Sequence, residues 1–285
     1  MVLCGPSGQA VVQACRMSGH TLAKADRGCP ALPPATIFAM PRLLAFIPHP
    51  DDESYSFGGT VALAARAGWD CFIECASFGE RGKRHDSGDT SPNGVAEARE
   101  AELEASCRLL GAHRPRCWGL PDGELRSHRG EQPRIASTIN RLDPALVLTL
   151  GSDGAYGHPD HISLHQWVTE AWAALPDPKP PLLYAAFPPA LFLPQYEKCI
   201  GMMGDPPSPS PSEIGARERH YTVDIRAVRE TKLASIRAHL SQLPEGDPEA
   251  LFPPGIVAAL LEEEWFTDAS GRADPGVAAL LASLA

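Results

Sequence analysis

Residues 43–53 read LLAFIPHPDDE, and this stretch decides the fold. Leu43–Pro48 is a continuous apolar run, which is typical of a strand buried on both faces of a parallel sheet. The run ends abruptly in the polar segment HPDDE at 49–53. Open α/β sheets place their sites just beyond the carboxyl ends of such strands. We therefore expect a central strand that leads directly into a group of functional side chains.

Strand and helix patterns alternate along the rest of the chain. The helix pattern at 95–110 is amphipathic, with Leu103, Cys107 and Leu110 as its expected core face. This alternation predicts an α/β fold, a Rossmann-like three-layer sandwich with a mainly parallel sheet. Further strands are expected at 71–77, 116–120, 145–150, 182–187 and, at an edge, 221–225, and helices at 59–67, 95–110, 133–142, 161–174, 226–243 and 256–266.

The composition excludes several classes of protein. The 285 residues include 25 Lys and Arg against 35 Asp and Glu, a net charge of −10 without a basic cluster, which argues against binding to nucleic acid. The apolar runs are far shorter than the ~20 residues of a membrane-spanning helix. We therefore expect a small-molecule partner and no membrane span. The chain is compatible with a homo-oligomer.

Residues 1–39 show no sustained periodicity, and the pattern changes at Met40. Two explanations stay open: a flexible N-terminal extension, or a mis-annotated start with Met40 as the true first residue. The segment lacks the basic start and apolar core of a signal peptide. The eight cysteines include no Cys-x-x-Cys pair, which fits reduced thiols in a cytoplasm. We expect one functional domain over 40–285.

A second histidine motif, YGHPDH at 156–161, follows the strand expected at 145–150. The tripeptide His-Pro-Asp thus occurs twice, whereas the composition predicts about 0.06 copies by chance. Both copies lie at the carboxyl ends of expected strands. We interpret them as two halves of one site.

The spacing within each motif suits a metal ion. His49 and Asp52 are three residues apart across a turn that Pro50 restricts, and His158 and His161 repeat that spacing at a helix start. Two histidines and a carboxylate are good zinc ligands, and three protein ligands leave one position open for water. At least one acid or histidine then stays free for proton transfer.

Together the motifs resemble the LmbE/PIG-L family of zinc-dependent N-deacetylases. The resemblance extends from about Leu43 to Gln242 and is carried by HPDDESYSFGGT from residue 49, the Arg-x-x-Glu helix at 99–102, the Pro-Asp-Gly turn at 121–123 and GHPDH at 157–161. It implies a zinc ion held by His49, Asp52 and His161. Iron or cobalt are possible occupants of the same ligands.

The resemblance also implies roles in catalysis. Asp51 is expected as the general base, and His158 as an imidazolium that faces the substrate carbonyl. For Tyr156, a hydrogen bond to the developing oxyanion and plain packing of the ring both stay open. Arg99 either contacts substrate or pairs with Glu102 on the helix surface. Asp122 is either a turn acid or a contact to a sugar hydroxyl.

Three further features have an ordinary and a functional interpretation. Glu53 either orients His49 or Asp52, or is an acid at a helix N-terminus, where the helix dipole stabilises a negative charge. His239 is expected in the core or behind the site. The loop at 201–212 is either a lid or a plain linker.

The function implied by the resemblance is hydrolysis of an N-acetyl group on an N-acetylglucosamine-type substrate, such as a low-molecular-weight thiol precursor, with release of acetate and a free amine. Two alternatives stay open: an amidase acting on thiol S-conjugates, with a larger acyl pocket, and a non-catalytic sugar- or metal-binding module. The chain has no Gly-x-Ser-x-Gly elbow, P-loop or His-Glu-x-x-His motif, so other hydrolase classes are disfavoured.

Overall fold

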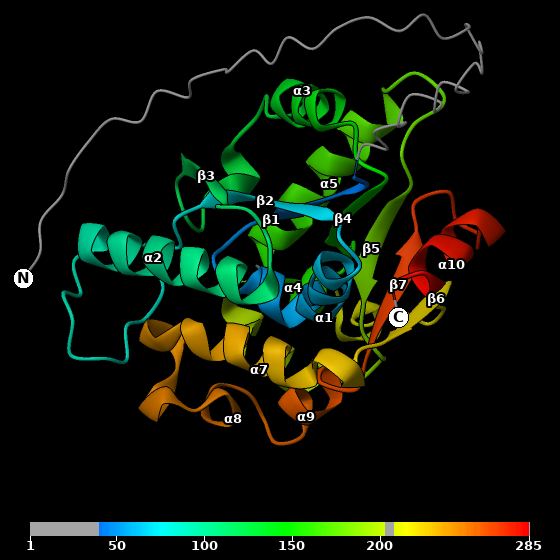
Figure 1. The fold of residues 1–285 in the computed structure, drawn as a ribbon. Helices are drawn as coiled ribbons and strands as arrows, with labels where there is room; N and C mark the ends of the chain where they lie inside the picture. The colour runs from blue at the N-terminus through cyan, green and yellow to red at the C-terminus, as the bar shows by residue number, and fades with distance from the viewer. Residues whose placement is uncertain (1–39, 203–207, 285) are drawn as a thin grey trace, which may run out of the picture. The chain divides into compact units, whose positions relative to one another are not determined.

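A computed structural model describes residues 40–202 and 208–284, so the expected N-terminal extension lies outside the described part. A seven-stranded sheet runs through the centre (Figure 1), in the order β3-β2-β1-β4-β5-β7-β6. Strands β1 to β5 pair in parallel, and β7 is antiparallel to β5 and β6. The strands are β1 (Arg42–Ile47), β2 (Asp70–Ser77), β3 (Arg116–Leu120), β4 (Leu146–Leu150), β5 (Leu182–Ala186), β6 (Tyr221–Asp224) and β7 (Glu263–Asp268).

Helices cover both faces of this sheet (Figure 1). On one face lie α1 (Asp52–Arg66), α2 (Pro92–Leu110) and α7 (Arg229–Ala238), and on the other α3 (Gln132–Leu142) and α5 (Pro159–Ala173). The three-layer sandwich and the mainly parallel sheet are therefore confirmed. Shorter helices are α4 (Gly154–Gly157), α6 (Leu193–Cys199), α8 (Pro248–Leu251), α9 (Ile256–Leu260) and α10 (Pro275–Ala282), and the 3-10 turn η5 (Leu240–Gln242) follows α7.

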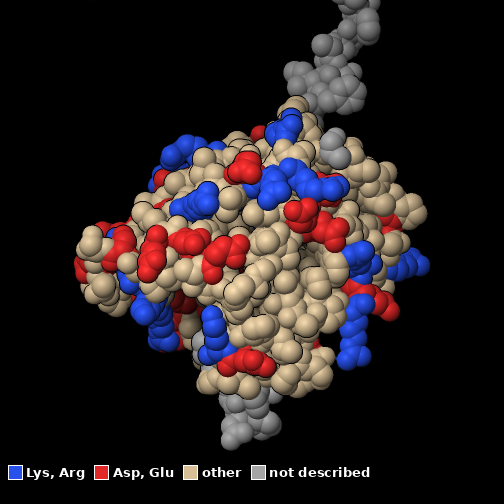
Figure 2. All heavy atoms as spheres, turned by 90° about the horizontal axis from the view of Figure 1, so that it is seen from below, with Lys and Arg blue, Asp and Glu red and all other residues tan. Residues whose placement is uncertain are grey.

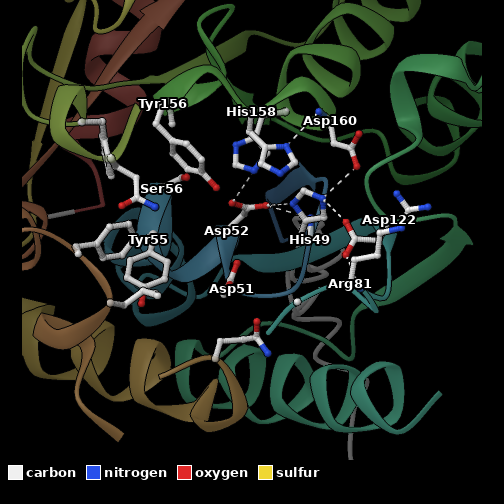
Figure 3. Close-up of a pocket in the computed structure, with 18 of the residues that line it drawn as sticks. His49, Asp51, Asp52, Tyr55, Ser56, Arg81, Asp122, Tyr156, His158 and Asp160 are labelled. Carbon is white, nitrogen blue, oxygen red and sulfur yellow. Dashed lines mark hydrogen bonds and ion pairs between the residues drawn. The ribbon is translucent and has the colours of Figure 1, made fainter. Parts of the chain in front are cut away.

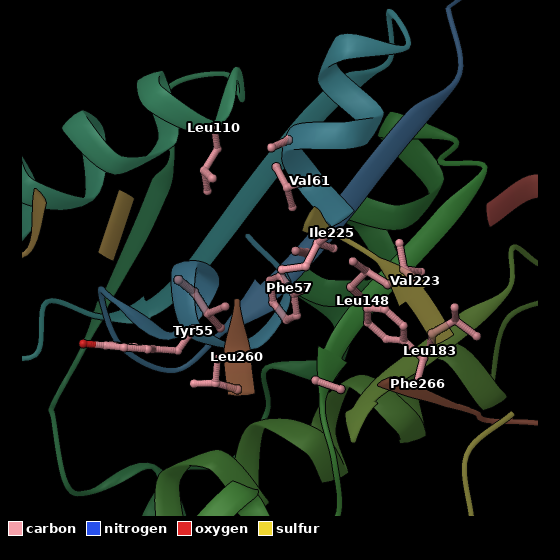
Figure 4. Close-up of a cluster of buried hydrophobic side chains, with 14 of the residues drawn as sticks. Tyr55, Phe57, Val61, Leu110, Leu148, Leu183, Val223, Ile225, Leu260 and Phe266 are labelled. Carbon is pink, nitrogen blue, oxygen red and sulfur yellow. The ribbon is translucent and has the colours of Figure 1, made fainter. Parts of the chain in front are cut away.

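The side chains of β1 alternate between two hydrophobic clusters. Leu43 and Ile47 pack with residues of α1, α2 and α7, whereas Leu44 and Phe46 pack with residues of α3 and α5. All four are fully buried, as expected for a central strand of a parallel sheet. Figure 4 shows part of the larger cluster, which also receives Leu103, Cys107 and Leu110, the expected core face of α2.

The C-terminal part departs from the expected pattern. The helix expected at 256–266 is wrong beyond Leu260, because Glu263–Asp268 forms β7 between β5 and β6. Alternate residues of this segment, Glu264 and Phe266 among them, are buried, which is the period of a strand. The helix expected at 226–243 likewise ends at Ala238, and α10 was not predicted.

The first helix also differs from expectation, because it begins at Asp52 rather than at Gly59. It contains a kink at Phe57, where φ is −152° and ψ is 21°. The part predicted from the sequence is the segment after this kink. The unpredicted first turn carries Asp52 into the site.

The surface carries charges of both signs. Figure 2 shows Lys and Arg interspersed with Asp and Glu over the face seen from below. Within 40–202 and 208–284, the helices are all too short or too polar to cross a membrane.

Candidate functional site

Two neighbouring strands deliver the two histidine motifs to the same edge of the sheet. β1 pairs with β4, so the loops that follow their carboxyl ends meet, as expected. His49 lies two residues after the end of β1. His158 caps helix α5, and its Nδ1 accepts from the backbone N of Asp160 at 3.2 Å. These residues line a cavity of about 540 Å³ (Figure 3).

The structure brings the three expected metal ligands together. The Asp52 carboxylate lies between two imidazoles, with Oδ2 at 3.4 Å from Nδ1 of His49 and Oδ1 at 3.4 Å from Nε2 of His161. The backbone N of His49 donates to Asp52 Oδ2 at 3.0 Å, which holds the carboxylate in place. Figure 3 shows Asp52 directed at the histidines.

The donor set fits a divalent metal ion. Both ring nitrogens of His161 are buried without a hydrogen-bond partner. Burial of unpaired polar atoms destabilises a protein, so a ligand such as a metal ion would complete the site. Burial lowers the pKa of His161 well below its ordinary value, so its imidazole is neutral, the form that binds metals. Nitrogens of His49, His158 and His161 lie within 4.8 Å of one another. The geometry thus suits a metal, and Asp52 supplies the negative charge.

Two carboxylates support His49 from the side away from Asp52. Its Nε2 lies 3.1 Å from Asp122 Oδ1 and 3.3 Å from Asp160 Oδ2. Burial disfavours the charged imidazole, but hydrogen bonds to Asp122, Asp160 and Asp52 outweigh it and raise the pKa of His49 well above its ordinary value. Such partners fix the ring and make a metal-binding histidine more basic.

Asp160 was missed by the sequence analysis as a functional residue. It is fully buried, and its carboxylate accepts from the backbone N of Gly123 at 2.7 Å and of Leu125 at 3.1 Å. The repeat of His-Pro-Asp was the available signal, because it places Asp160 at the position that Asp51 has in the first motif. The neighbouring Asp122 contacts His49 through Oδ1.

Asp51 is near the ligands but bonded elsewhere. Its Oδ2 accepts from Arg99 Nη2 at 3.0 Å, and its side chain keeps 19% of its surface exposed. Burial raises the pKa of Asp51 to about 6, although Arg99 acts in the opposite direction. An acid with a pKa in this range suits a general base near neutral pH.

Arg99 does not form the surface ion pair with Glu102 that the spacing favoured. It is buried, and its guanidinium also donates to the backbone O of Gly79 at 2.9 Å and to that of Pro50. Glu102 instead accepts from the backbone N and the hydroxyl of Ser241. Arg99 lines the cavity, but most of its donors are used to hold Asp51 and the loops around it.

The surroundings of His158 disfavour the imidazolium expected there. Burial lowers its pKa to about 2, and the adjacent His161 and His49 add to this effect, so the ring is neutral. Because Nδ1 accepts a backbone hydrogen bond, the proton of the neutral ring lies on Nε2. In this neutral form His158 is a hydrogen-bond donor at Nε2.

Tyr156 lines the cavity beside the histidines. Its ring centroid is 5.9 Å from that of His158 and 5.4 Å from that of His161. Figure 3 shows its hydroxyl directed toward Asp52 and the centre of the site. The preceding loop is tightly folded: Ala155 has a φ of 65°, and Asp153 accepts from its backbone N at 3.2 Å.

The cavity has two different walls on either side of the histidines. One wall carries polar side chains of the loops after β2 and β3, including Arg81, Lys83 and Asp122. The other is aromatic, with Phe192 packed against Phe187 and Phe252 at centroid distances of 4.7 and 5.9 Å. The site thus offers both hydrogen-bonding and apolar contacts to a bound molecule.

Comparison with known proteins adds sequence similarity to this geometry. The family model for GlcNAc-PI de-N-acetylase (PIG-L) matches residues 44–172. A 1D-myo-inositol 2-acetamido-2-deoxy-alpha-D-glucopyranoside deacetylase from Rhodococcus jostii is 32% identical, covering 81% of this chain and 92% of that protein. The deacetylase of the same name from Thermobifida fusca is 28% identical, covering 79% and 92%.

Solved structures share the fold at lower identity. The N,N'-diacetylchitobiose deacetylase from Pyrococcus horikoshii has a TM-score of 0.56 at 22% identity, covering 83% of this chain and 84% of that one. The 4-carboxy-2-hydroxymuconate hydratase from Pseudomonas putida has a TM-score of 0.59 at 22% identity, covering 80% and 96%. Since one neighbour is named a hydratase, the fold alone does not decide the reaction.

Proposed function

The chain belongs to the GlcNAc-PI de-N-acetylase (PIG-L) family, and from this membership we propose that it is a zinc-dependent hydrolase that removes the N-acetyl group from a small N-acetylglucosamine glycoside. The products are acetate and a free amine. The observation that carries the proposal is the convergence of Asp51 with His49, Asp52 and His161 in one cavity. The names of the curated relatives favour an inositol glycoside as the substrate.

His49, Asp52 and His161 would hold the metal ion. When bound, zinc polarises an amide carbonyl and lowers the pKa of water toward about 7. Asp122 and Asp160 keep the ring of His49 in place, which is the usual role of carboxylates behind a metal ligand.

Asp51 accepts the proton of the attacking water. Arg99 binds one of its carboxylate oxygens, so the other remains for the proton. A positioned base of this kind typically accelerates a reaction by about 10²–10⁴-fold. After the attack, the same carboxyl group is in place to return a proton to the leaving amine.

His158 and Tyr156 stabilise the oxyanion that forms from the carbonyl. The neutral His158 donates through Nε2–H, and the phenol of Tyr156 is directed to the same region (Figure 3). Burial raises the pKa of Tyr156 well above its ordinary value, so it keeps its proton and stays a donor. Fixed donors aimed at developing charge are among the largest contributions to catalysis.

In this proposal the sugar and its aglycone contact the two walls of the cavity. Asp122 and Arg99 line the polar side and are candidates for contacts to sugar hydroxyls, although both are also engaged with His49 and Asp51. The aromatic side suits the apolar face of a ring.

Cytoplasmic location and assembly into a homo-oligomer remain predictions.

The proposal is tested by release of primary amine from N-acetylglucosamine compounds. Zinc-loaded protein is assayed, with and without chelator, on the free sugar, an inositol glycoside, a malate glycoside and chitobiose. We expect chelator-sensitive release that is fastest with the inositol glycoside. Bound zinc without any amine release would contradict the deacetylase and favour the thiol S-conjugate amidase or a binding module.

Asp51→Asn separates catalysis from metal binding. The amide keeps the size of the side chain but cannot take a proton, so kcat should fall by about 10²–10⁴-fold. Zinc content, measured per folded chain, should stay at the wild-type level because Asp51 is not a ligand. Undiminished turnover in this variant would rule out Asp51 as the base.

A further inference from the structure

Asp51 has an unusual backbone conformation. Its φ is 111°, in the left-handed region that residues with side chains rarely adopt. Such a conformation is strained and persists only where its surroundings enforce it. The groups that contact Asp51 must therefore enforce the conformation of the proposed general base.

Glu53 binds the backbone of Asp51. Its Oε2 accepts from the backbone N of Asp51 at 3.0 Å, and the Glu53 side chain is fully buried. This contact is not the expected one to His49 or Asp52, but Glu53 does lie in the first turn of α1, as the alternative of an acid at a helix start expected. The carboxylate instead uses one oxygen to fix the strained residue before α1.

The second oxygen of Glu53 is held by two distant elements. Oε1 accepts from the hydroxyl of Ser106 on α2 and lies 2.8 Å from Nε2 of His239, at the end of α7. Ser106 and His239 are also fully buried. Burial lowers the pKa of His239, but the charge and hydrogen bond of Glu53 outweigh this and raise it, which favours a charged pair. We call Glu53, Ser106 and His239 the Glu53 cluster.

We propose that the Glu53 cluster is a positioning device for the reaction: it holds Asp51 in its left-handed conformation, so that the Asp51 carboxylate faces the metal ligands. The inference rests on the proposed role of Asp51 as general base. Glu53 and His239 touch no reacting atom and act through Asp51. Because Ser106 lies on α2 and His239 directly follows α7, correct placement of the base depends on packing of these helices.

The competing explanation is a plain core ion pair, and the chain offers a matched control for it. Glu264 is also buried, accepts from the backbone N of Gly59 at 2.7 Å and of Thr60 at 2.8 Å in the same helix α1, and pairs with the buried Lys232 at 2.6 Å. It has the same chemistry as Glu53 but does not bind Asp51. Removal of either carboxylate leaves a buried cation unpaired and lowers stability.

The experiment compares Glu53→Ala, Glu53→Gln and Glu264→Ala, with kcat, KM and bound zinc measured per folded chain. For Glu53→Ala we expect kcat to fall by about 10²-fold, as for a misplaced catalytic group, with KM and zinc content near wild type. Glu53→Gln should recover to within about tenfold, because an amide oxygen can still accept from Asp51. Glu264→Ala should lose stability but keep kcat. An equal loss of kcat in Glu53→Ala and Glu264→Ala would overturn the proposal.

A structural measurement makes the test independent of the substrate. In a crystal structure of Glu53→Ala, the φ of Asp51 should relax to a negative value, whereas it should stay near 111° in Glu264→Ala. A left-handed Asp51 in Glu53→Ala would overturn the inference even if the enzyme is active, and a relaxed Asp51 would support it even if the substrate class proves different. Should Glu53→Ala fail to fold, His239→Gln, which removes the cation but keeps Glu53, is expected to lower kcat about tenfold with zinc retained, and an unchanged kcat in that variant counts against the cluster.

Discussion

Asp51 and Asp160 occupy the same position in two copies of His-Pro-Asp, yet the fold gives them different surroundings. Asp160 is fully buried and satisfied by backbone donors beneath His49. Asp51 lies at the cavity with one oxygen on Arg99. Asp160 is suited to hold the metal-binding His49 in place, and Asp51 is suited to accept a proton. A repeated motif therefore need not repeat its chemistry, because the partners come from other elements.

The pH dependence of the reaction should report on Asp51. Burial raises its pKa to about 6, and the base form exists above that pKa, so kcat/KM should rise with pH through an acid limb. A bound cation favours the carboxylate and lowers the pKa, which places the limb at or below about pH 6. The measurement is kcat/KM from pH 4.5 to about 8 with zinc kept bound.

Arg99→Met provides the control for this profile. The guanidinium lowers the pKa of Asp51, so its removal should move the acid limb to higher pH. Because Arg99 also holds the backbone O of Gly79, the variant is checked for zinc content and folding first. An acid limb at the same pH in both proteins would mean that another group titrates.

At the scale of elements, helix α1 connects the site to the core through its kink. The helix restarts after Phe57, and Glu264 of β7 accepts from the backbone N of Gly59 and Thr60 there. A carboxylate at a helix start satisfies donors that have no partner within the helix. The C-terminal strand thus stabilises the part of α1 that follows the kink.

The close approach of α1 to Ile225 requires a glycine at position 59. A Cβ on Gly59 would lie 2.5 Å from Cγ2 of Ile225, closer than real Cβ contacts come. We expect Gly59→Ala to lower the free energy of unfolding by about 1–3 kcal/mol, despite the better helix propensity of alanine. Gly58→Ala is the matched control, because its nearest contact would be 3.4 Å. Equal stability of the two variants by denaturant unfolding would contradict this account.

For the whole molecule, the metal should link the segment that follows β1 to the segment that follows β4. His49 and Asp52 follow β1 and His161 follows β4, so an ion bound by all three stabilises only the folded state. At free zinc about 100 times its Kd this contributes about 2.7 kcal/mol. Chelator should therefore lower Tm by about 5–10 °C in a domain of this size and abolish activity.

Restoration distinguishes loss of metal from damage to the protein. Added zinc should recover both Tm and amine release, whereas His161→Ala should show a low Tm that chelator does not change. If chelator strips the zinc from wild-type protein without a change in Tm, these residues do not form a linking metal site.

Hydrophobic pattern and motif position were sufficient for most of the fold. The buried run at 43–48 and the regular alternation of elements predicted the parallel sheet, because burial on both faces demands such a sequence. The same pattern failed at 256–266, where a short amphipathic segment became β7. Its strand conformation comes from pairing with β5 and β6, which no local pattern encodes.

The residues of the site divide in the same way. By itself, the sequence determined that His49, Asp52, His158 and His161 meet at one edge, since the chain places them after parallel strands with fixed spacing. Only the tertiary structure showed that the surroundings of His158 favour the neutral ring, because burial and the neighbouring histidines lower its pKa. It alone also brought His239, 186 residues from Glu53 in the chain, to 2.8 Å from the Glu53 carboxylate. Spacing in sequence predicts which groups converge, whereas charge and conformation follow from the surroundings that packing creates.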